Sequence, residues 1–434
     1  MQGFSPVILT VWQGRSYKNN KSESQTIVSS LNTNKNIMLF RKKYVLALLA
    51  SGMAWYGLHA EEDKAVVIDT ESAKVEAALD AEIADMDKAA PTGSETNSSA
   101  TIISAIQNVP DWTQDLANRI KVHGYAQGGY TYMSKGAQEH TNTFDIKRVL
   151  FWANAQITDR WSFLFMHDFS SVVQEFYTDY RLTNNKALTV RFGQFKNALS
   201  YENKLSPTGQ EVIDVYADGV TYLTGCGSDP LFGVQYGRDL GLALFGETND
   251  GKLRYEVNIL NGTGVNKKDG NREKDFIGRL DFKPVKGLTL VASGQIGRGH
   301  AKAASLYCPD IQVGEDYTRN RWTAGFDYNT KPLHIHGEYL EGKDKNTTSR
   351  GAYLTGCVPI MADKLDFVGS YDFFNFNTDL KMDQHKAVAG LQYWFYKNCR
   401  FQVQYVYKNT YVENGVFRHG ANHGVMCQMQ IRFN

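Results

Sequence analysis

The sequence contains no stretch of the roughly 18–20 consecutive apolar residues that a membrane-spanning helix requires. Proline is scarce, at 9 of 434 residues, and the five cysteines show no CxxC spacing of a metal or redox site. A formal net charge of +1 gives no basic excess that would suggest nucleic acid. GxSxG, HExxH, P-loop and dinucleotide-binding motifs are also missing. We therefore expect no helical membrane span, no nucleic-acid partner, no enzyme, and neither cofactor nor metal.

Glycine and aromatic residues are plentiful. The chain has 38 Gly, 24 Tyr and 23 Phe. Aromatic residues favour β-strands, and glycine suits tight turns and close backbone approaches. This composition favours many long strands joined by short turns.

The segment before residue 120 predicts export. Residues 38–60, "MLFRKKYVLALLASGMAWYGLHA", have a basic start, a mostly apolar stretch at 44–55 and a small residue before an acidic segment. This pattern is typical of a secretory signal peptide. Because residues 1–37 are polar and patternless, we expect Met38 to be the true start and 1–37 to be a mis-annotated upstream extension.

Residues 61–119 are predicted to form an acidic periplasmic segment. Positions 61–90 hold ten Asp or Glu against three Lys, with Val75, Leu79, Ile83 and Met86 at helical spacing. Both a short amphipathic helix and a disordered lead fit this composition. Residues 91–101 have the composition of a linker.

From residue 120 to 434 the chain alternates strand and connection about every 20 residues. Sixteen strands are predicted near 120–132, 144–157, 160–169, 174–183, 187–195, 239–248, 252–262, 275–284, 288–297, 319–330, 333–341, 349–360, 364–376, 385–396, 399–408 and 423–433. Most are close to the roughly 9–11 residues with which a tilted strand crosses a membrane.

The connections are short and long in alternation, which places all short turns at one rim. The short ones are 158–160, 183–186, 249–251, 284–287, 329–332, 361–364 and 397–398. The long ones are 133–143, 196–238, 263–274, 298–318, 342–348, 377–384 and 409–422, with 170–173 as a short exception. Outer-membrane barrels have this asymmetry, whereas a soluble sandwich has no reason to show it. The sequence predicts an all-β fold, a transmembrane antiparallel up-and-down barrel.

The faces of the strands agree with this prediction. The last strand alternates Val425, Cys427, Met429, Ile431 and Phe433 with polar residues. A charge on the lipid face near the membrane centre costs roughly 2–4 kcal/mol, so Arg and Glu must face the interior. The last strand is then expected to close the barrel, with its aromatic residue at the periplasmic rim.

Two groups of residues leave alternatives open. Cys226 and Cys308 fall in predicted loops and could pair, whereas Cys427 on an apolar face reads as a small hydrophobic residue. His334 and His336 share one face of a strand, a spacing that can hold a metal. We prefer to interpret these histidines as polar residues that face the interior of the barrel.

One region of the sequence resembles the phosphate-selective porin O/P family of Gram-negative bacteria. It consists of "LTVRFGQFKNALSYENKLSPTGQEVIDVYADGVTYLTG" (188–225), with "FYTDYRL" before it and "KLRYEVNILNGTG" after it. Residues 144–169 resemble the first hairpin of that family. The resemblance covers about residues 120–434. It implies a trimeric, sixteen-stranded outer-membrane channel whose third long loop, here 196–238, folds inward and narrows the pore. It also implies anion capture by lysines at the constriction and by an arginine ladder.

The candidate pore-lining and constriction residues follow from the expected interior face and loop. They are Arg148, Arg181, Arg191, Lys196, Lys204, Arg254, Arg279, Arg321, Arg400, Arg432, Asp179, Glu202, Glu211, Asp214, Glu256, Asp327 and Glu338. Residues 120–434 hold 36 Lys and Arg against 32 Asp and Glu, and the long loop itself is net acidic. Rings of Arg or Lys favour anions and rings of Asp or Glu favour cations, so this mixture predicts weak selectivity. Each arginine has the alternative role of an ion pair within the wall.

The leading hypothesis is a diffusion channel for small hydrophilic solutes or ions, with anions such as phosphate among them. The alternatives are a non-conducting structural or adhesive barrel plugged by 196–238, and an outer-membrane enzyme. The expected partners are the lipid bilayer, lipopolysaccharide, the outer-membrane assembly machinery acting on the last strand, and two further copies in a homotrimer.

Overall fold

The computed structural model describes residues 119–135, 142–229, 231 and 233–433 of the chain. The predicted upstream extension, the signal peptide and nearly all of the acidic segment lie outside the described residues. They stay predictions.

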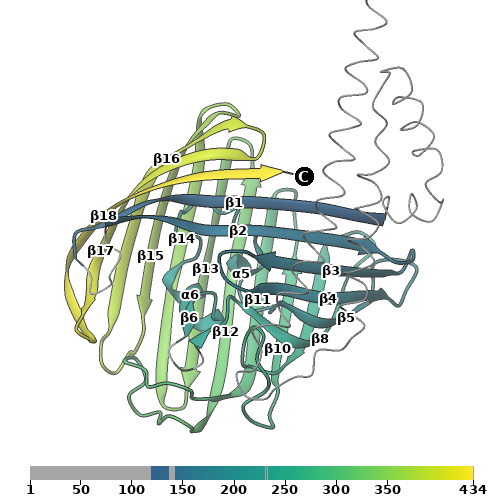
Figure 1. Ribbon diagram of the computed structural model, residues 1–434, viewed down its shortest axis with the longest axis horizontal. Coiled ribbons are helices and arrows are strands. Elements are labelled where there is room, and N and C mark those ends of the chain that lie inside the picture. Colours follow the sequence, from purple (N-terminus) through teal and green to yellow (C-terminus); the bar gives the residue numbers. More distant parts are fainter. Residues whose placement is uncertain (1–118, 136–141, 230, 232, 434) are drawn as a thin grey trace, which may run out of the picture. The chain divides into compact units, whose positions relative to one another are not determined.

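Sixteen antiparallel strands form one closed barrel, and neighbouring strands follow the order of the sequence around it (Figure 1). The barrel strands are β1 (Ile120–Met133), β2 (Asn142–Gln156), β3 (Trp161–Asp168), β4 (Val173–Arg181), β5 (Thr189–Lys196), β8 (Arg238–Glu247), β9 (Leu253–Leu260), β10 (Asp275–Phe282), β11 (Leu288–His300), β12 (Asp316–Thr330), β13 (Leu333–Asp344), β14 (Thr347–Met361), β15 (Leu365–Asn375), β16 (Asp383–Tyr396), β17 (Cys399–Glu413) and β18 (Val416–Phe433). Between β5 and β8 lie the helices α5 (Tyr201–Lys204) and α6 (Asp218–Thr224) and the two-residue strands β6 (Ser228–Asp229) and β7 (Gly233–Val234). The predicted sixteen-stranded up-and-down barrel is confirmed.

The last strand closes the barrel against the first, as its alternation predicted. In the ladder between β1 and β18, Gly124 lies opposite Phe433 and Tyr130 lies opposite Cys427. A Cβ atom at Gly124 would lie 2.5 Å from the Phe433 ring, so this position accepts no side chain without a shift. The Phe433 ring also packs on Phe151, with 5.3 Å between ring centroids. The terminal aromatic residue therefore secures the seam of the barrel.

The two faces of the wall have the predicted polarity. On β17 the side chains of Phe401, Val403 and Tyr405 are exposed on the outside, whereas Gln402 and Gln404 are fully buried inside. The same alternation runs through β8 to β18. An apolar exterior and a polar interior are the arrangement that a barrel needs in lipid.

Two connections that were predicted to be long are tight turns in the structure. β13 and β14 are joined by residues 345–346 and not by a 342–348 loop, and β17 and β18 are joined by 414–415 and not by 409–422. Apolar alternation ends where the strands leave the apolar band, but the hydrogen-bonded ladder continues into the polar tip. Asn414 and Gly415 both have positive φ, as a two-residue hairpin turn of the primed type requires. The predicted connection 377–384 is found at 376–382, and the longest connections of this rim are 197–237, 261–274 and 301–315.

Among the described residues, no helix is both long enough and apolar enough to cross a membrane. Cys226 and Cys308 are not joined by a disulfide. The thiol of Cys226 instead donates to Oδ1 of Asn203 at 3.0 Å. The pairing that the sequence left open is therefore not formed.

Candidate functional site

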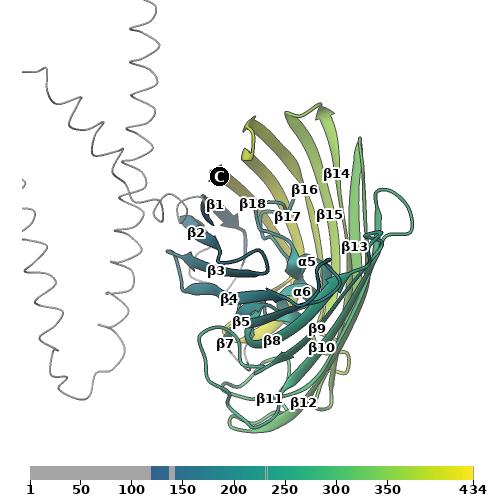
Figure 2. The same ribbon diagram turned by 90° about the vertical axis from the view of Figure 1, so that its right-hand side faces the viewer.

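Residues 197–237, the connection between β5 and β8, fold into the barrel. Figure 2 shows α5 and α6 inside the ring of strands. α6 contacts β13, β14 and β15, which are remote from β5 and β8 in the order of the ring. The inward fold that the resemblance implied for this loop is confirmed, and we call residues 197–237 the inserted loop.

An apolar seat on the interior wall receives α6. Val220 and Leu223 of the helix are fully buried against Leu340, Tyr353 and Phe374, which point inward from β13, β14 and β15. Complete burial of such a side chain contributes about 1.5–3 kcal/mol.

A second apolar contact of the inserted loop lies on the last three strands. There Ile213 packs on Val388, Val406 and Met426. The two contacts together hold the inserted loop against the wall from β13 to β18.

Four arginines of the predicted set also hold the inserted loop. Three donate to its main-chain carbonyl oxygens: Arg279 to Ser200, Arg321 to Leu223, and Arg400 to Gln210. Arg432 donates to the Thr208 hydroxyl at 2.9 Å. Hydrogen bonds from a charged donor are about twice as strong as neutral ones. These arginines anchor the loop, so they do not form an exposed ladder.

Glu211 connects the inserted loop to two histidines of β13. Its Oε1 lies 2.7 Å from His334 Nδ1 and its Oε2 lies 3.2 Å from His336 Nε2. Burial opposes ionisation, but the hydrogen bonds from both histidines hold the pKa of Glu211 well below its usual range.

His334 also meets a second carboxylate, because its Nε2 lies 2.7 Å from Asp327 Oδ1. A ring between two carboxylates must donate from both nitrogens, so His334 is the imidazolium. The pair His334 and His336, which could have suggested a metal site, thus holds the loop.

Asp218, the first residue of α6, sits in a buried ionic cluster. Lys386 of β16 lies 2.7 Å from Asp218 and 3.2 Å from Asp372. The Asp218 N–H donates to the Asp372 carboxylate at 2.6 Å. Burial opposes ionisation, yet Lys386 lowers the pKa of Asp218 to about 2. A single lysine thus joins the helix start to the wall.

Two buried glutamates meet near α5. Glu338 of β13 accepts hydrogen bonds from the Ser200 hydroxyl at 2.7 Å and from the Tyr201 N–H at 3.0 Å. Glu202 accepts the Ala217 N–H at 2.8 Å. Burial raises the pKa of Glu202 well above its usual value in spite of this bond, and the neighbouring Glu338 adds to the rise. Burial and the neighbouring Glu338 carboxylate thus both oppose the ionisation of Glu202.

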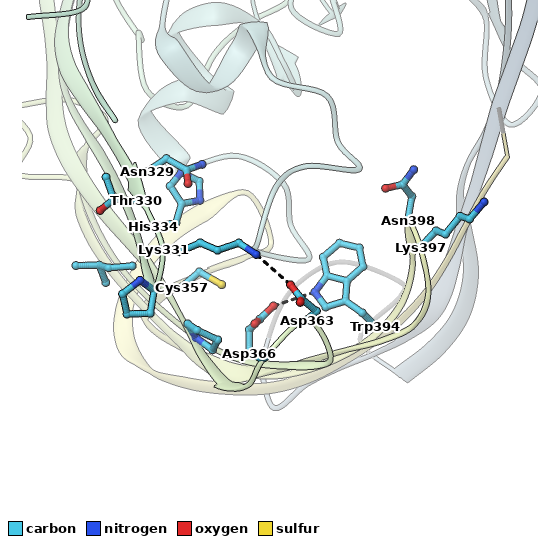
Figure 3. A pocket seen from close by; sticks show the side chains of 14 residues that line it. Asn329, Thr330, Lys331, His334, Cys357, Asp363, Asp366, Trp394, Lys397 and Asn398 are labelled. Carbon is cyan, nitrogen blue, oxygen red and sulfur yellow. Dashed lines mark hydrogen bonds and ion pairs between the residues drawn. The ribbon is translucent and has the colours of Figure 1, made fainter. Parts of the chain in front are cut away.

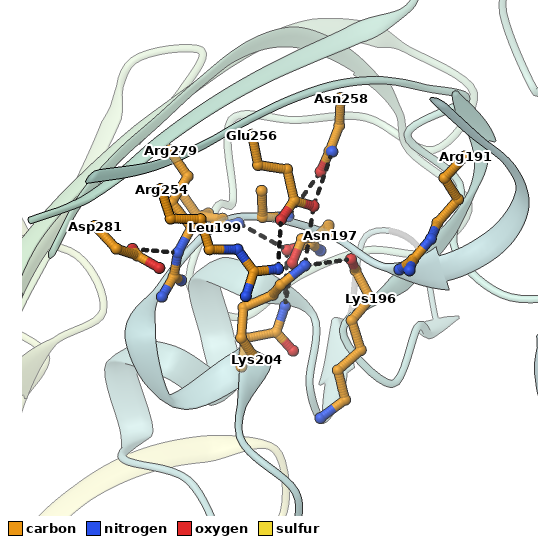
Figure 4. Close-up of polar contacts among 12 residues, drawn as sticks. Arg191, Lys196, Asn197, Leu199, Lys204, Arg254, Glu256, Asn258, Arg279 and Asp281 are labelled. Carbon is orange, nitrogen blue, oxygen red and sulfur yellow. Dashed lines mark hydrogen bonds and ion pairs between the residues drawn. The ribbon is translucent and has the colours of Figure 1, made fainter. Parts of the chain in front are cut away.

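The two lysines of the predicted constriction are engaged, and Figure 4 shows the contact of Lys204 with Glu256. The Lys204 ammonium lies 2.9 Å from Glu256 of β9. Lys196, which ends β5, points away from Glu256 and donates to the Leu205 carbonyl oxygen at 2.5 Å. Asp214 is half-buried in the inserted loop. The expected cationic constriction is therefore a set of loop contacts.

The interior face of β2 to β5 differs, because many of its side chains remain half-exposed. Arg191 makes two 2.7 Å hydrogen bonds to Asp179, and its guanidinium lies 3.7 Å from the centroid of the Tyr177 ring. Arg148 donates to Gln127 at 3.2 Å and is also half-exposed. We call this face the open wall and the interior face of β12 to β18 the covered wall.

A cavity of about 290 Å³ continues the open wall to the short-turn rim. Its charged lining residues are Arg160, Arg181, Lys186, Arg254, Asp179 and Glu247. Both carboxylates are paired, Asp179 with Arg191 and Glu247 with Lys186 at 3.2 Å. The Arg254 side chain is 50% exposed. The accessible charge in this cavity is therefore mainly cationic.

A pocket of about 520 Å³ lies at the same rim on the other side, near the turns that follow β12, β14 and β16 (Figure 3). Asp366 accepts hydrogen bonds from the Trp394 indole and from Gln392, each at 2.8 Å. Lys331 and Asp363 form an exposed ion pair at 3.2 Å.

Sequence reasoning missed several residues that seat the inserted loop. Gln402 and Gln404 both donate to the Glu211 carbonyl oxygen, at 2.8 and 2.7 Å. Their alternation on β17 identified them as interior residues, but no pattern indicated what they would meet. Leu340, Tyr353 and Phe374 are apolar residues at interior positions. Apolar residues at interior positions of three neighbouring strands could have indicated that a loop covers this part of the wall.

No family model and no curated protein matches the chain. Solved structures do match its fold. An anion-selective porin from Comamonas acidovorans has a TM-score of 0.53 at 12% identity, over 72% of this chain and 99% of that one. OmpT of Vibrio cholerae (0.50, 15%) and the outer membrane channel DcaP of Acinetobacter baumannii (0.50, 13%) each cover 72% of this chain and 97% of theirs. The chain therefore has the porin fold. The resemblance to the O/P family stays a prediction.

Proposed function

We propose that this protein is a Gram-negative outer-membrane porin, a water-filled diffusion channel for small hydrophilic solutes and ions. The observation that carries the proposal is the contrast inside the barrel: the inserted loop seals the covered wall and leaves the open wall half-exposed. A continuous route for solute then runs along β2 to β5. The apolar exterior and the similarity to solved porins support a place in the outer membrane.

The proposal extends to anions, with phosphate among them. Four cationic side chains against two paired carboxylates in the cavity of the open wall support this preference. A cationic passage raises the local concentration of anions and repels cations. The buried arginines of the covered wall make no contribution to the route, because they are bound to loop carbonyl groups.

The proposal also includes the expected biogenesis and assembly. Residues 38–60 direct export, and the assembly machinery recognises the last strand. The short-turn rim faces the periplasm, lipopolysaccharide surrounds the outer leaflet, and three copies form a trimer. A cross-linking experiment on the membrane-embedded protein tests the trimer.

Reversal potential in a salt gradient tests the channel and its selectivity together. Purified protein in a planar bilayer should give conductance steps, and the reversal potential should have the sign of anion preference. Arg254→Gln should shift that potential toward zero, whereas Lys364→Gln, at the exposed turn before β15, should change it less. A reversal potential of cationic sign would contradict the anion preference.

A plugged, non-conducting barrel is the second candidate. The inserted loop contacts strands that are far apart in the ring, because Gln127 of β1 donates to the Pro207 carbonyl oxygen at 3.3 Å while Lys204 lies 2.9 Å from Glu256 of β9. A folded barrel without conductance steps would favour this candidate. A hydrolase assay on the same preparation tests the third, an outer-membrane enzyme, for which we expect no activity.

A further inference from the structure

The open wall carries an apolar stripe that faces the interior. Its members are Trp152 of β2, Leu164 and Met166 of β3, and Tyr177 of β4. Trp152 lies directly opposite Met166, and Leu164 lies opposite Tyr177, so the four side chains form one continuous patch. All four are half-buried, while Phe151 and Phe176 occupy the alternate, outer positions.

Such a patch is unusual inside a water-filled barrel, whose interior is normally polar. Apolar interior residues on the covered wall have a plain explanation, because α6 and Ile213 bury them. Of the stripe, only Tyr177 packs at the edge of one of the buried apolar clusters. One face of the Trp152 indole stacks on the His123 ring, with 5.2 Å between centroids, which fixes its orientation. The stripe is therefore an apolar surface on the proposed route, in which the His123 ring holds Trp152 in place.

Cationic groups border the stripe along the route. At the end toward the short-turn rim, Arg191 lies over the Tyr177 ring, and the cavity with Arg181 and Arg254 follows. At the other end, Arg148 is the next interior charge on β2, two interior positions from Trp152. A solute that moves along β2 to β5 thus meets an apolar surface between Arg191 and Arg148. The carboxylate opposite Met166, Glu175, is buried in an ion pair with Arg238 at 2.8 Å.

We propose that the stripe selects small organic anions with an aromatic body, such as a benzoate-type carboxylate. The inference rests on the proposed channel function and narrows its solute class. The carboxylate pairs with Arg191 or Arg148 while the ring lies on Trp152, Leu164 and Met166. Aromatic rings gain from contact with an apolar surface and from edge or offset stacking, and a hydroxylated anion of equal charge gains neither.

The test compares two carboxylates of the same charge in the full-length protein. Reversal potentials in planar bilayers give the permeability of benzoate and of gluconate, each relative to chloride. The wild type should favour benzoate. The double variant Leu164→Gln/Met166→Gln should reduce the benzoate ratio about two- to tenfold, as the loss of one contact between the Met166 sulfur and an aromatic ring predicts. Chloride conductance and the gluconate ratio should stay unchanged.

Trp152→Ser and Trp394→Ser form a matched pair of controls. Both residues are interior tryptophans, but Trp394 lies in the pocket across the barrel. Only Trp152→Ser should lower the benzoate ratio. Two results would overturn the inference and leave the channel intact. One is chloride conductance with equal permeability ratios for benzoate and gluconate, and the other is a benzoate ratio that falls in Trp394→Ser alone. A folded protein without chloride conductance would overturn both the channel and the inference.

Discussion

The open wall and the covered wall are built on the same plan but are used differently. Both alternate an apolar outer face with an interior face that mixes charged, amide and apolar side chains. On the covered wall Arg400, Gln402 and Gln404 are almost completely buried, whereas Arg191 and Asp179 on the open wall remain partly exposed. The difference comes from one connection, because the inserted loop packs on β12 to β18. The role of an interior arginine is therefore decided by what covers it.

The inserted loop is held by chemistry of two kinds. Leu223 and Val220 are buried in the apolar seat, and Glu211 and Asp218 are tied to histidines and a lysine of the wall. Buried ionic contacts fix orientation more than they add stability, because desolvation offsets much of their attraction. We therefore expect the apolar seat to contribute most of the docking free energy.

Of all the variants, Leu223→Ala should reduce the difference in exposure between the covered wall and the open wall the most. Truncation of a fully buried leucine costs about 2–5 kcal/mol, here in the docking of α6 on the covered wall. The loop should leave the wall part of the time. A cysteine placed at Thr355, a buried residue of β14 that lies opposite His336, should then react with a thiol reagent about tenfold faster or more, in a chain whose native cysteines are alanine.

The control is Leu290→Ala, which shortens an exposed leucine on the outer face of β11. It should leave the labelling of Thr355→Cys unchanged. Equal labelling rates in Leu223→Ala and the parent chain would show that the apolar seat does not hold the loop.

The fold was predictable because its signals are local. Strict alternation, turn residues and the alternating lengths of the connections specify strands, faces and barrel closure without any knowledge of distant contacts. The exceptions have the same cause: the tips of β17 and β18 extend past the apolar band, so hydrophobic alternation could not reveal their length. The candidate site was predictable only in part. Arg279, Arg321 and Arg400 were correctly assigned to the interior, but their carbonyl partners lie 79, 98 and 190 residues away in sequence.

Glu211→Gln should have the next largest effect. Glutamine has one accepting side-chain oxygen in place of two, so one of the two bonds from His334 and His336 is lost, and a hydrogen bond to a charged group contributes about 1.5–3 kcal/mol. Because the folded pKa of Glu211 is depressed, its contribution is present above about pH 4.3 and is lost as the pH falls through the folded value. The wild-type conductance should stay constant from pH 7 to about pH 4.3 and rise below it.

The variant Glu211→Gln should already show the raised conductance at pH 7. Asp214→Asn, which changes a half-exposed carboxyl of the same loop, should behave as the wild type. Wild-type conductance in Glu211→Gln at pH 7 would mean that the histidines do not hold the loop.

Glu202→Gln should have a smaller effect, with the opposite dependence on pH. The folded pKa of Glu202 is raised, so the docked loop loses stability as the pH rises above about 4.3 toward the folded pKa. Glutamine copies the neutral acid and removes this loss. Labelling of Thr355→Cys, compared between Glu202→Gln and the parent at each pH from 4 to 9, should be equal at the acid end and slower in the variant above about pH 4.3. A constant ratio would contradict a raised pKa.

The smallest effect is expected from Arg191→Lys on the open wall. Lysine keeps the charge but loses the paired hydrogen bonds to Asp179 and the stacking on Tyr177. Because this ion pair is partly exposed, its loss should lower the free energy of unfolding by about 1 kcal/mol or less and leave the reversal potential unchanged.

The matched change Arg400→Lys removes buried bonds to Gln392 and to the Gln210 carbonyl oxygen, and should lower the free energy of unfolding more. Denaturant midpoints of both variants in lipid vesicles measure the difference, and equal midpoints would mean that the two walls do not differ in the way that the inserted loop implies.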